Sequence, residues 1–301
     1  MRWMPALLIA AIGGVFVGAC GELDSPSSSV EVTEVSGVNE LTSDVTVYRP
    51  EGSGPWPTAV FYPAIHSPRT TLDPFARELA AAGMVVTTVD YDANDLFNGS
   101  PECSQRFATL TAHERGGDPD DVLITGGHSL GAAVASMVSL FEPYLDRNGE
   151  PLDCGLDAMD LPPTDLVVGL SGTWHPTECD TTSPFASANF VRGVPDGFPA
   201  LISPHDGNPQ VPFLLAHGTD DHVCLPDQAE WAAQEWESAG HDVESLVLDG
   251  AGHIEGVIFA QSAEDWPDVE FTESDTSRAI VEAITAHLPS HTSPEPDPAG
   301  G

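Results

Sequence analysis

Residues 122–140 read Val-Leu-Ile-Thr-Gly-Gly-His-Ser-Leu-Gly-Ala-Ala-Val-Ala-Ser-Met-Val-Ser-Leu and carry the clearest structural signal in the chain. Val122 to Thr125 is a short apolar, β-branched run, which is typical of a strand buried on both faces. Leu130 to Leu140 is rich in alanine and other small residues, which permit a helix to pack closely on a sheet. Between them lies Gly127-His128-Ser129-Leu130-Gly131. The stretch therefore predicts a strand, a tight turn and a helix in direct succession.

Further apolar runs alternate with helix-like segments on both sides of this unit. Strands are predicted at Val45–Tyr48, Thr58–Tyr62, Met84–Val89, Val122–Thr125, Leu166–Leu170, Pro212–Ala216 and Val243–Leu248. Helices are predicted at Thr71–Gly83, Leu130–Leu140, Pro226–Ala239 and Ser274–Leu288. This alternation predicts an α/β fold with a mostly parallel, doubly wound sheet and helices on both faces. The longest irregular stretches, Asp92–Ser104 and Ser171–Gln210, are candidates for loops that cover a site.

The turn at Ser129 has the pattern Gly-x-Ser-x-Gly, which in a strand–turn–helix context predicts a nucleophile elbow. A Cβ at either flanking glycine would clash with the neighbouring strand or helix, so the turn holds the serine hydroxyl at the sheet edge. The following helix directs its first amides toward any oxyanion formed there. The alternative is a serine that only caps the helix after a glycine turn.

A serine hydroxyl needs a base to become a nucleophile, and two later strands lead into candidate partners. Pro212–Ala216 is followed by His217-Gly218-Thr219-Asp220-Asp221, and Val243–Leu248 is followed by Asp249-Gly250-Ala251-Gly252-His253. The chain order serine, acid, histidine is the order expected for such an elbow. The alternative for His253 is a surface loop histidine.

These three motifs, in this order, resemble the α/β-hydrolase superfamily over roughly Val45–Leu288, with esterases and the dienelactone-hydrolase, polyester-hydrolase and chlorophyllase-like branches nearest. The resemblance implies a serine esterase that cleaves carboxylic esters through an acyl-enzyme, with Ser129 as nucleophile and His253 as base. The family pattern His-Gly-x-x-Asp places the acid on Asp221, with Asp220 as the competitor. The substrate is a small-molecule or polymeric ester, and no cofactor or metal is needed.

The same resemblance predicts two backbone donors for the oxyanion. One is the N–H of Leu130, and losing such a donor typically lowers the rate about 10²–10³-fold. The other comes from the loop after Thr58–Tyr62, where relatives carry His-Gly-x and this chain has Pro63-Ala64-Ile65. Ile65 is the predicted donor, and Ala64 is the alternative. Trp174 either lines the substrate pocket or packs in the core.

Other functions remain open on the same sequence. The triad also serves amidases, thioesterases and lipases, and the fold also allows a surface-binding module without catalysis. His128, His217 and His222 lie inside the motifs and are predicted to shape the site, whereas His241 precedes a strand and lies at the wrong edge of the sheet. A metallohydrolase is disfavoured because the histidines do not have ligand spacing.

The composition excludes other classes of function. The 301 residues include 47 acidic and nine basic side chains, all nine of them arginine, and the formal net charge is −38. Such a charge repels phosphate backbones, so no nucleic-acid partner is expected. The charge is interpreted as an adaptation to salt or as a device that steers substrate, and the first interpretation is favoured.

The ends of the chain predict export. Residues 1–19 combine one positive charge with an apolar run from Ala6 to Val17, too short to span a membrane but typical of a signal peptide. Val17-Gly18-Ala19-Cys20 resembles a bacterial lipoprotein signal, which implies lipidation of Cys20 and anchoring at the cell envelope, periplasmic or cell-surface, as the sole membrane contact. The alternative is an ordinary signal peptide that is cut nearby. Residues 20–40 are predicted to be a tether, 41–289 the catalytic domain and 290–301 a disordered tail.

Four cysteines remain after Cys20. An even number in an exported chain predicts disulfides, with three possible pairings. Cys179 and Cys224 each follow a strand at the edge that carries the predicted site. We favour the pairs Cys179–Cys224 and Cys103–Cys154, and no zinc site, because the cysteines lack the close paired spacing of zinc ligands.

Overall fold

The computed structural model describes residues 29–91, 96, 100–140, 153–156, 162–174, 210–253 and 275–288. In this part of the chain eight strands form one sheet in the order β1-β2-β4-β3-β5-β6-β7-β8. They are β1 (Val30–Val35), β2 (Val45–Pro50), β3 (Thr58–Tyr62), β4 (Val85–Val89), β5 (Leu123–His128), β6 (Leu166–Leu170), β7 (Phe213–Gly218) and β8 (Val243–Leu248). Strand β2 pairs antiparallel with β1 and β4, and all other neighbours are parallel.

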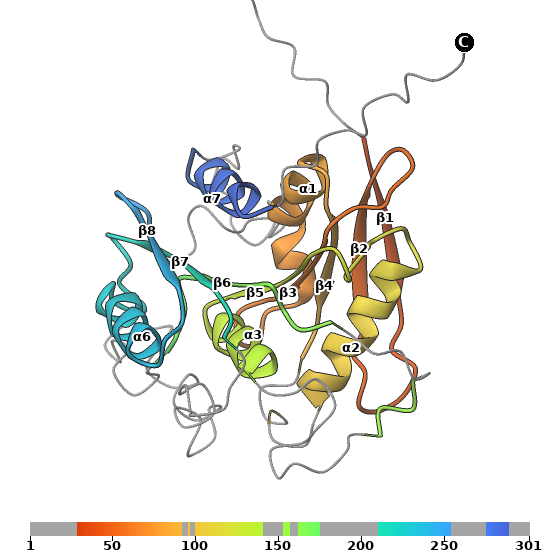
Figure 1. Cartoon of the computed structure of the whole chain (residues 1–301), viewed down its shortest axis with the longest axis horizontal. Helices are drawn as coiled ribbons and strands as arrows, with labels where there is room; N and C mark the ends of the chain where they lie inside the picture. Colours follow the sequence, from red (N-terminus) through yellow and green to blue (C-terminus); the bar gives the residue numbers. More distant parts are fainter. Residues whose placement is uncertain are drawn as a thin grey trace, which may run out of the picture.

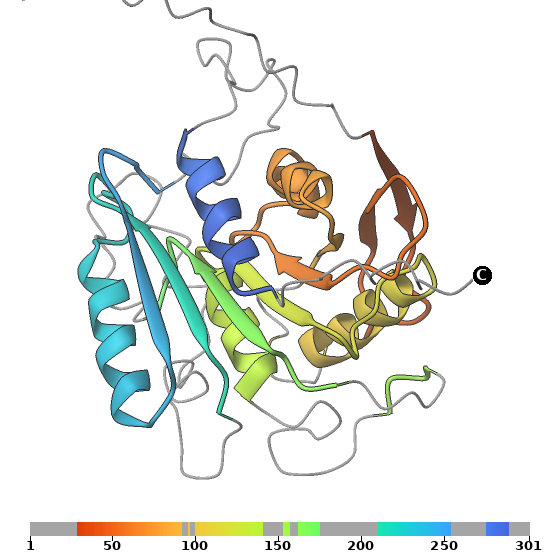
Figure 2. The same cartoon turned by 45° about the horizontal axis from the view of Figure 1, so that its top comes forward.

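Helices cover both faces of the sheet (Figures 1 and 2). The described helical segments are η1 (Arg69–Leu72), α1 (Asp73–Ala81), α2 (Ser100–His113), α3 (Leu130–Leu140), α6 (Asp227–Ser238) and α7 (Asp275–Ala286). One core cluster packs α1 and α7 on one face, and a second packs α2, α3 and α6 on the other. The predicted α/β class, a mostly parallel sheet between two helical layers, is confirmed.

The central strands are buried along their whole length because helices lie on both sides of them. Every residue of β3, β4, β5, β6 and β7 is buried. These are the continuous apolar and β-branched runs from which the strands were predicted. Strand β8, at the edge of the sheet, is mostly exposed or half-buried, and Val247 is 71% exposed.

Two elements differ from the sequence prediction. Strand β1 lies inside the range 20–40 that was predicted to be a tether, and it pairs with β2 over its whole length. Helix α2 was not predicted, and it includes residues 100–104, which were assigned to a loop. Its apolar periodicity is weak because buried polar residues face the core, where Gln105 hydrogen-bonds Tyr62 and Thr125. Tertiary contacts of this kind leave little hydrophobic pattern in the sequence.

The parallel strands bring three loops to one edge of the sheet. Strands β5, β6, β7 and β8 lie side by side, with His128 opposite Leu170 and Gly218 opposite Leu248 at their carboxyl ends. In open α/β sheets, ligands bind at this edge. The fold therefore places the segments that follow β5, β7 and β8 next to one another.

One predicted disulfide is confirmed, because Cys103 on α2 is bonded to Cys154. Cys224 is also disulfide-bonded, and its predicted partner Cys179 lies outside the described residues. The predicted signal peptide with Cys20 and the predicted tail 290–301 lie outside them as well. Within the described ranges, no helix has the length and apolar character needed to cross a membrane.

Candidate active site

The turn between β5 and α3 holds Ser129 in a strained conformation. Its φ is +55°, in the left-handed region that side-chain-bearing residues rarely adopt. The backbone N–H of Ser129 donates to the carbonyl of Leu170 at 2.9 Å, which fixes the turn to β6. A Cβ at Gly127 would overlap the backbone of Gly131, and one at Gly131 would overlap the carbonyl oxygens of Tyr62 and Pro63. Both flanking glycines are therefore required, as the motif predicts.

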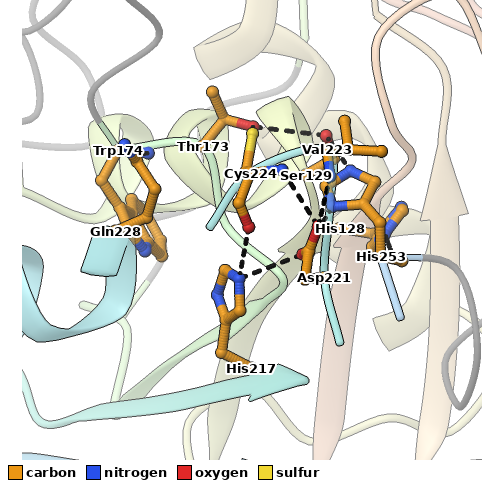
Figure 3. A network of polar contacts seen from close by, with 10 residues as sticks. All are labelled: His128, Ser129, Thr173, Trp174, His217, Asp221, Val223, Cys224, Gln228 and His253. Atoms are coloured by element: carbon orange, nitrogen blue, oxygen red, sulfur yellow. Dashed lines mark hydrogen bonds and ion pairs between the residues drawn. The ribbon is translucent and has the colours of Figure 1, made fainter. Parts of the chain in front are cut away.

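Ser129, His253 and Asp221 form a continuous chain of hydrogen bonds (Figure 3). The Oγ of Ser129 lies 3.0 Å from Nε2 of His253, and Nδ1 of His253 lies 2.8 Å from Oδ2 of Asp221. Ser129 is 1% exposed, and the side chains of His253 and Asp221 are 8% and 0% exposed. With Nδ1 donating to the carboxylate, Nε2 presents its lone pair to the serine hydroxyl. The arrangement can move a proton from Ser129 to His253.

The carboxylate of Asp221 is surrounded by donors. Oδ1 accepts from the backbone N–H groups of Val223, at 2.9 Å, and Cys224, at 3.0 Å. Oδ2 lies 3.0 Å from Nε2 of His217 as well as 2.8 Å from His253. Burial alone would raise the pKa of Asp221, but the hydrogen bonds and charges of the two histidines outweigh it and hold the pKa below its ordinary value. Asp221 is therefore ionised at neutral pH.

The other acidic and histidine candidates lie elsewhere. Asp220, the competitor for Asp221, is exposed, and its backbone N–H donates to the carbonyl of Ala251. His222 is also exposed. His241 lies just before β8, and its ring bonds the backbone of Val211. The structure thus brings Asp221, and not its neighbour, to His253.

His128, the residue before Ser129, contacts the main chain of His253. Its Nε2 lies 2.7 Å from the carbonyl oxygen of His253, so this nitrogen carries the hydrogen and donates. Burial, together with the nearby His253, lowers the pKa of His128 to about 3. His128 is therefore neutral over the physiological range and holds the backbone of the loop that carries His253.

Thr173 is a member of the site that the sequence analysis did not identify. Its buried Oγ1 lies 3.3 Å from Oγ of Ser129 and 3.3 Å from Sγ of Cys224 (Figure 3). Its backbone N–H also donates to the carbonyl of Ser129. The sequence signal that could have identified it is its position. Thr173 is the second polar side chain after β6, the strand next to β5. Polar residues at the ends of neighbouring parallel strands meet at one edge.

Solved structures share this architecture, whereas no family model and no curated protein matches the chain. An inhibited esterase B from Lactobacillus rhamnosis superposes with a TM-score of 0.63 at 17% identity, over 85% of this chain and 87% of that one. The esterase Est2 of Thermogutta terrifontis gives 0.60 at 15% identity, over 89% and 96%. The chain has the α/β-hydrolase fold. The same Thermogutta esterase phosphonylated by sarin gives 0.60 at 16% identity, over 87% and 94%.

In this α/β-hydrolase fold, the two predicted oxyanion donors lie close to the turn. Leu130 is the first residue of α3, so its N–H has no partner within the helix. Gly131 lies against the carbonyl of Pro63, which brings the loop after β3 to the start of α3. Among the described residues, none accepts a hydrogen bond from the N–H of Leu130, Ala64 or Ile65. The choice between Ala64 and Ile65 thus stays a prediction.

Trp174 occupies the core of the α/β-hydrolase fold. Its side chain is fully buried, and its ring makes an edge contact with Trp236 of α6 at 4.8 Å between centroids. A Cβ at Gly169 or Gly172 would overlap the indole, and the backbone N–H of Trp174 donates to Gln228. Of the two alternatives drawn from the sequence, the structure supports core packing over pocket lining.

The described part of the site offers no place for a metal. Within those residues, no group of three or more His, Cys, Asp and Glu side chains has an arrangement that could hold a metal ion. Two imidazoles contact Asp221, those of His217 and His253, and the nitrogens that face it donate hydrogen bonds to its carboxylate. The geometry is that of a proton-transfer site.

Proposed function

We propose that the protein is a serine hydrolase that cleaves carboxylic esters through an acyl-enzyme. The observation that carries this proposal is the pair of contacts around His253: 3.0 Å from Nε2 to Oγ of Ser129 and 2.8 Å from Nδ1 to Oδ2 of Asp221. A base within hydrogen-bond distance of a hydroxyl, itself oriented by a buried carboxylate, is the arrangement needed to activate a serine.

In the first half of the reaction, His253 takes the proton of Ser129 while Oγ attacks the carbonyl carbon of the ester. The negative charge passes to the carbonyl oxygen, which the N–H groups of Leu130 and Ile65 stabilise, with Ala64 as the alternative second donor. Asp221 orients His253 and stabilises its protonated ring. The carbon–oxygen bond to the alcohol then breaks, and the alcohol leaves with the proton from Nε2 of His253.

In the second half, water replaces the alcohol. His253 takes a proton from the water while the water oxygen attacks the acyl carbon. The bond between that carbon and Oγ of Ser129 then breaks. Ser129 recovers its proton from His253, and the carboxylic acid departs. One ester and one water are consumed in each cycle, one alcohol and one carboxylic acid are released, and Ser129 and His253 return to their starting states.

The solved structures support an ester as the substrate. Among the proteins with a similar fold, the esterase B structure is of a C6-C4 SN3 inhibited form, and the Thermogutta terrifontis esterase 2 is phosphonylated by sarin. Fold likeness at this identity fixes the architecture and leaves the substrate to the experiment. A small-molecule or polymeric ester remains the proposed class.

The test is hydrolysis of p-nitrophenyl acetate and butyrate by the purified protein. We expect turnover that Ser129→Ala abolishes, together with covalent labelling of the wild type by a fluorophosphonate. Ser136→Ala is the matched control, because Ser136 is a buried serine of α3 whose hydroxyl bonds the carbonyl of Ala132. Absence of both turnover and labelling in the wild type would contradict the proposal and favour a binding module without catalysis.

We also propose that the protein is exported and anchored to the bacterial cell envelope by lipidation of Cys20. The support is the signal-like sequence of residues 1–19 and the Cys103–Cys154 disulfide, a bond that persists in oxidising compartments. Expression in a bacterial host, followed by fractionation and mass spectrometry of the mature N-terminus, tests it. Cys20→Ser should release the protein from the membrane fraction, and a wild type found entirely in the soluble fraction contradicts the anchor.

A further inference from the structure

Two imidazoles share one oxygen of Asp221 (Figure 3). Oδ2 lies 2.8 Å from Nδ1 of His253 and 3.0 Å from Nε2 of His217. The same Nε2 of His217 lies 2.8 Å from the carbonyl oxygen of Cys224. Both neighbours of this nitrogen are acceptors, so Nε2 carries a hydrogen and is the donor.

The opposite nitrogen of His217 completes the assignment. Nδ1 is buried and has no hydrogen-bond partner within the described ranges. A second hydrogen on this nitrogen would be a buried, unpaired donor on a charged ring, which is costly. His217 is therefore a neutral imidazole with its hydrogen on Nε2, held between the carboxylate and the main chain of Cys224.

With His217 in place, the acceptor capacity of Asp221 is filled. An ionised carboxylate offers about four lone-pair positions. Oδ1 accepts from the N–H groups of Val223 and Cys224, and Oδ2 accepts from His253 and His217. Three donors other than His253 therefore stabilise the negative charge of Asp221, which weakens the attraction between the carboxylate and the ring of His253.

We propose that His217 is a positioning residue of the active site, which shares Oδ2 of Asp221 with His253 and so limits how strongly the carboxylate retains the protonated ring of His253. This inference rests on the proposed function. A carboxylate that held the protonated ring too tightly would make His253 a poorer donor to the leaving alcohol. His217 also keeps Oδ2 in the orientation that His253 requires.

The other polar and charged groups near Asp221 do not replace His217 as a donor to its carboxylate. His253, His217 and His128 interact electrostatically with Asp221, and His128 faces His253 from the end of β5, with ring centroids 5.0 Å apart. Thr173, after β6, and Gln228, on α6, are uncharged, and the neighbouring Asp220 and His222 are exposed. Among the described residues, His217 is the only side chain other than His253 that donates to the carboxylate of Asp221.

The test compares His217→Gln with His217→Asn. The side-chain amide nitrogen of Gln reaches the position of Nε2, so His217→Gln keeps a donor to Asp221. The amide nitrogen of Asn reaches only the position of Nδ1, so His217→Asn removes that donor. We expect the acid limb of the kcat/KM profile for p-nitrophenyl butyrate to move up by about one pH unit in His217→Asn and to stay in place in His217→Gln. KM should change little in either. An unmoved limb in His217→Asn, or equal shifts in both variants, would overturn the proposal.

A second test uses only the wild-type protein and depends neither on ester turnover nor on whether a variant folds. Nitrogen-15 NMR of the histidine rings distinguishes the two neutral tautomers. We expect His217 to carry its hydrogen on Nε2 with Nδ1 bare, and a hydrogen on Nδ1 alone overturns the proposal. Failure of the proposed function is seen separately, as absence of ester turnover and of fluorophosphonate labelling in the wild type.

Discussion

His128 donates a hydrogen bond from Nε2 to the backbone carbonyl of His253 over 2.7 Å, so the residue next to Ser129 holds the main chain of the histidine that faces Ser129. The two rings lie 5.0 Å apart between centroids. The turn after β5 and the loop after β8 are thereby joined directly, independently of the contact between the Ser129 hydroxyl and the His253 ring. This second bond ties the main chain at His253 to the end of β5.

Loss of that bond should lower the rate of ester hydrolysis. His128→Phe keeps a ring and removes the donor, whereas His128→Gln keeps a donor. We expect kcat to fall about tenfold or more in His128→Phe, because small displacements of a catalytic group cost rate steeply, with KM little changed. Steady-state kinetics on p-nitrophenyl butyrate measures both constants. Equal kcat values in His128→Phe and the wild type would show that the bond does not position His253.

His128 should also make the folded protein sensitive to acid. Its pKa is lowered from 6.5 to about 3 in the folded state, so only the unfolded chain gains a proton as the pH falls below about 6.5. The stabilisation is complete above that pH and is lost toward pH 3, at about 1 kcal/mol per pH unit. Urea unfolding at pH 7.5, 5.5 and 4.5 should show a steeper loss in the wild type than in His128→Phe. Parallel pH dependences would contradict this.

The close approach at Gly131 should make it intolerant of any side chain. Gly131→Ala places a methyl group against the carbonyl oxygens of Tyr62 and Pro63 and should lower both the melting temperature and the activity strongly. Gly83→Ala is the control: its φ of +102° is strained for alanine, but no atom lies within 4 Å of the added Cβ. It should cost about 1 kcal/mol and leave kcat unchanged. Similar losses of activity in the two variants would contradict the steric explanation.

Thr173 should contribute modestly to catalysis through its hydroxyl. When Ser129 donates to His253, its Oγ can accept from Oγ1 of Thr173, which lies 3.3 Å away. Thr173→Val keeps the shape and removes the donor, so we expect kcat/KM to fall about fivefold, the equivalent of one neutral hydrogen bond. Thr173→Ser should retain most activity. A valine variant with wild-type kcat/KM would exclude a role for this contact.

The acidic surface should make stability depend on salt. A formal net charge of −38 causes self-repulsion in the compact state, and salt screens it. We therefore expect the melting temperature to rise as sodium chloride increases from about 10 mM to 1 M, with the steepest rise at the low end. Differential scanning fluorimetry measures this, and sodium and potassium chloride should agree if screening is the cause. A melting temperature that falls with salt would contradict it.

The sequence predicted the parts of the molecule in which local pattern and final environment agree. Buried strands such as β3 and β6 are continuous apolar runs, and Ser129 directly follows the buried strand β5, whereas His253 follows the edge strand β8. The glycines on both sides of Ser129 are needed because a Cβ there would overlap the backbone, so their presence in the sequence already indicates the tight turn. For β3, β5 and β6, composition and spacing are sufficient because every residue of these strands is buried.

The remaining features depend on contacts between distant segments. Asp220 and Asp221 are adjacent and chemically identical, so only the path of the chain after β7 decides which one reaches His253. Helix α2 buries polar side chains that are satisfied by β3 and β5, and its hydrophobic pattern is correspondingly weak. The contact between His217 and Asp221 and the contact between Thr173 and Ser129 likewise form only once the strands are aligned.

Strand β1 has a practical consequence for handling the protein. It is the outermost strand at one end of the sheet, while β7 and β8, which carry Asp221 and His253, stand at the other. Any purification tag, surface linker or solid support joined upstream of Val30 is attached through that far flank. An immobilised preparation made this way keeps the reacting groups away from the point of attachment, whereas cutting the chain within β1 uncovers the hydrogen-bonding groups of β2 and invites self-association.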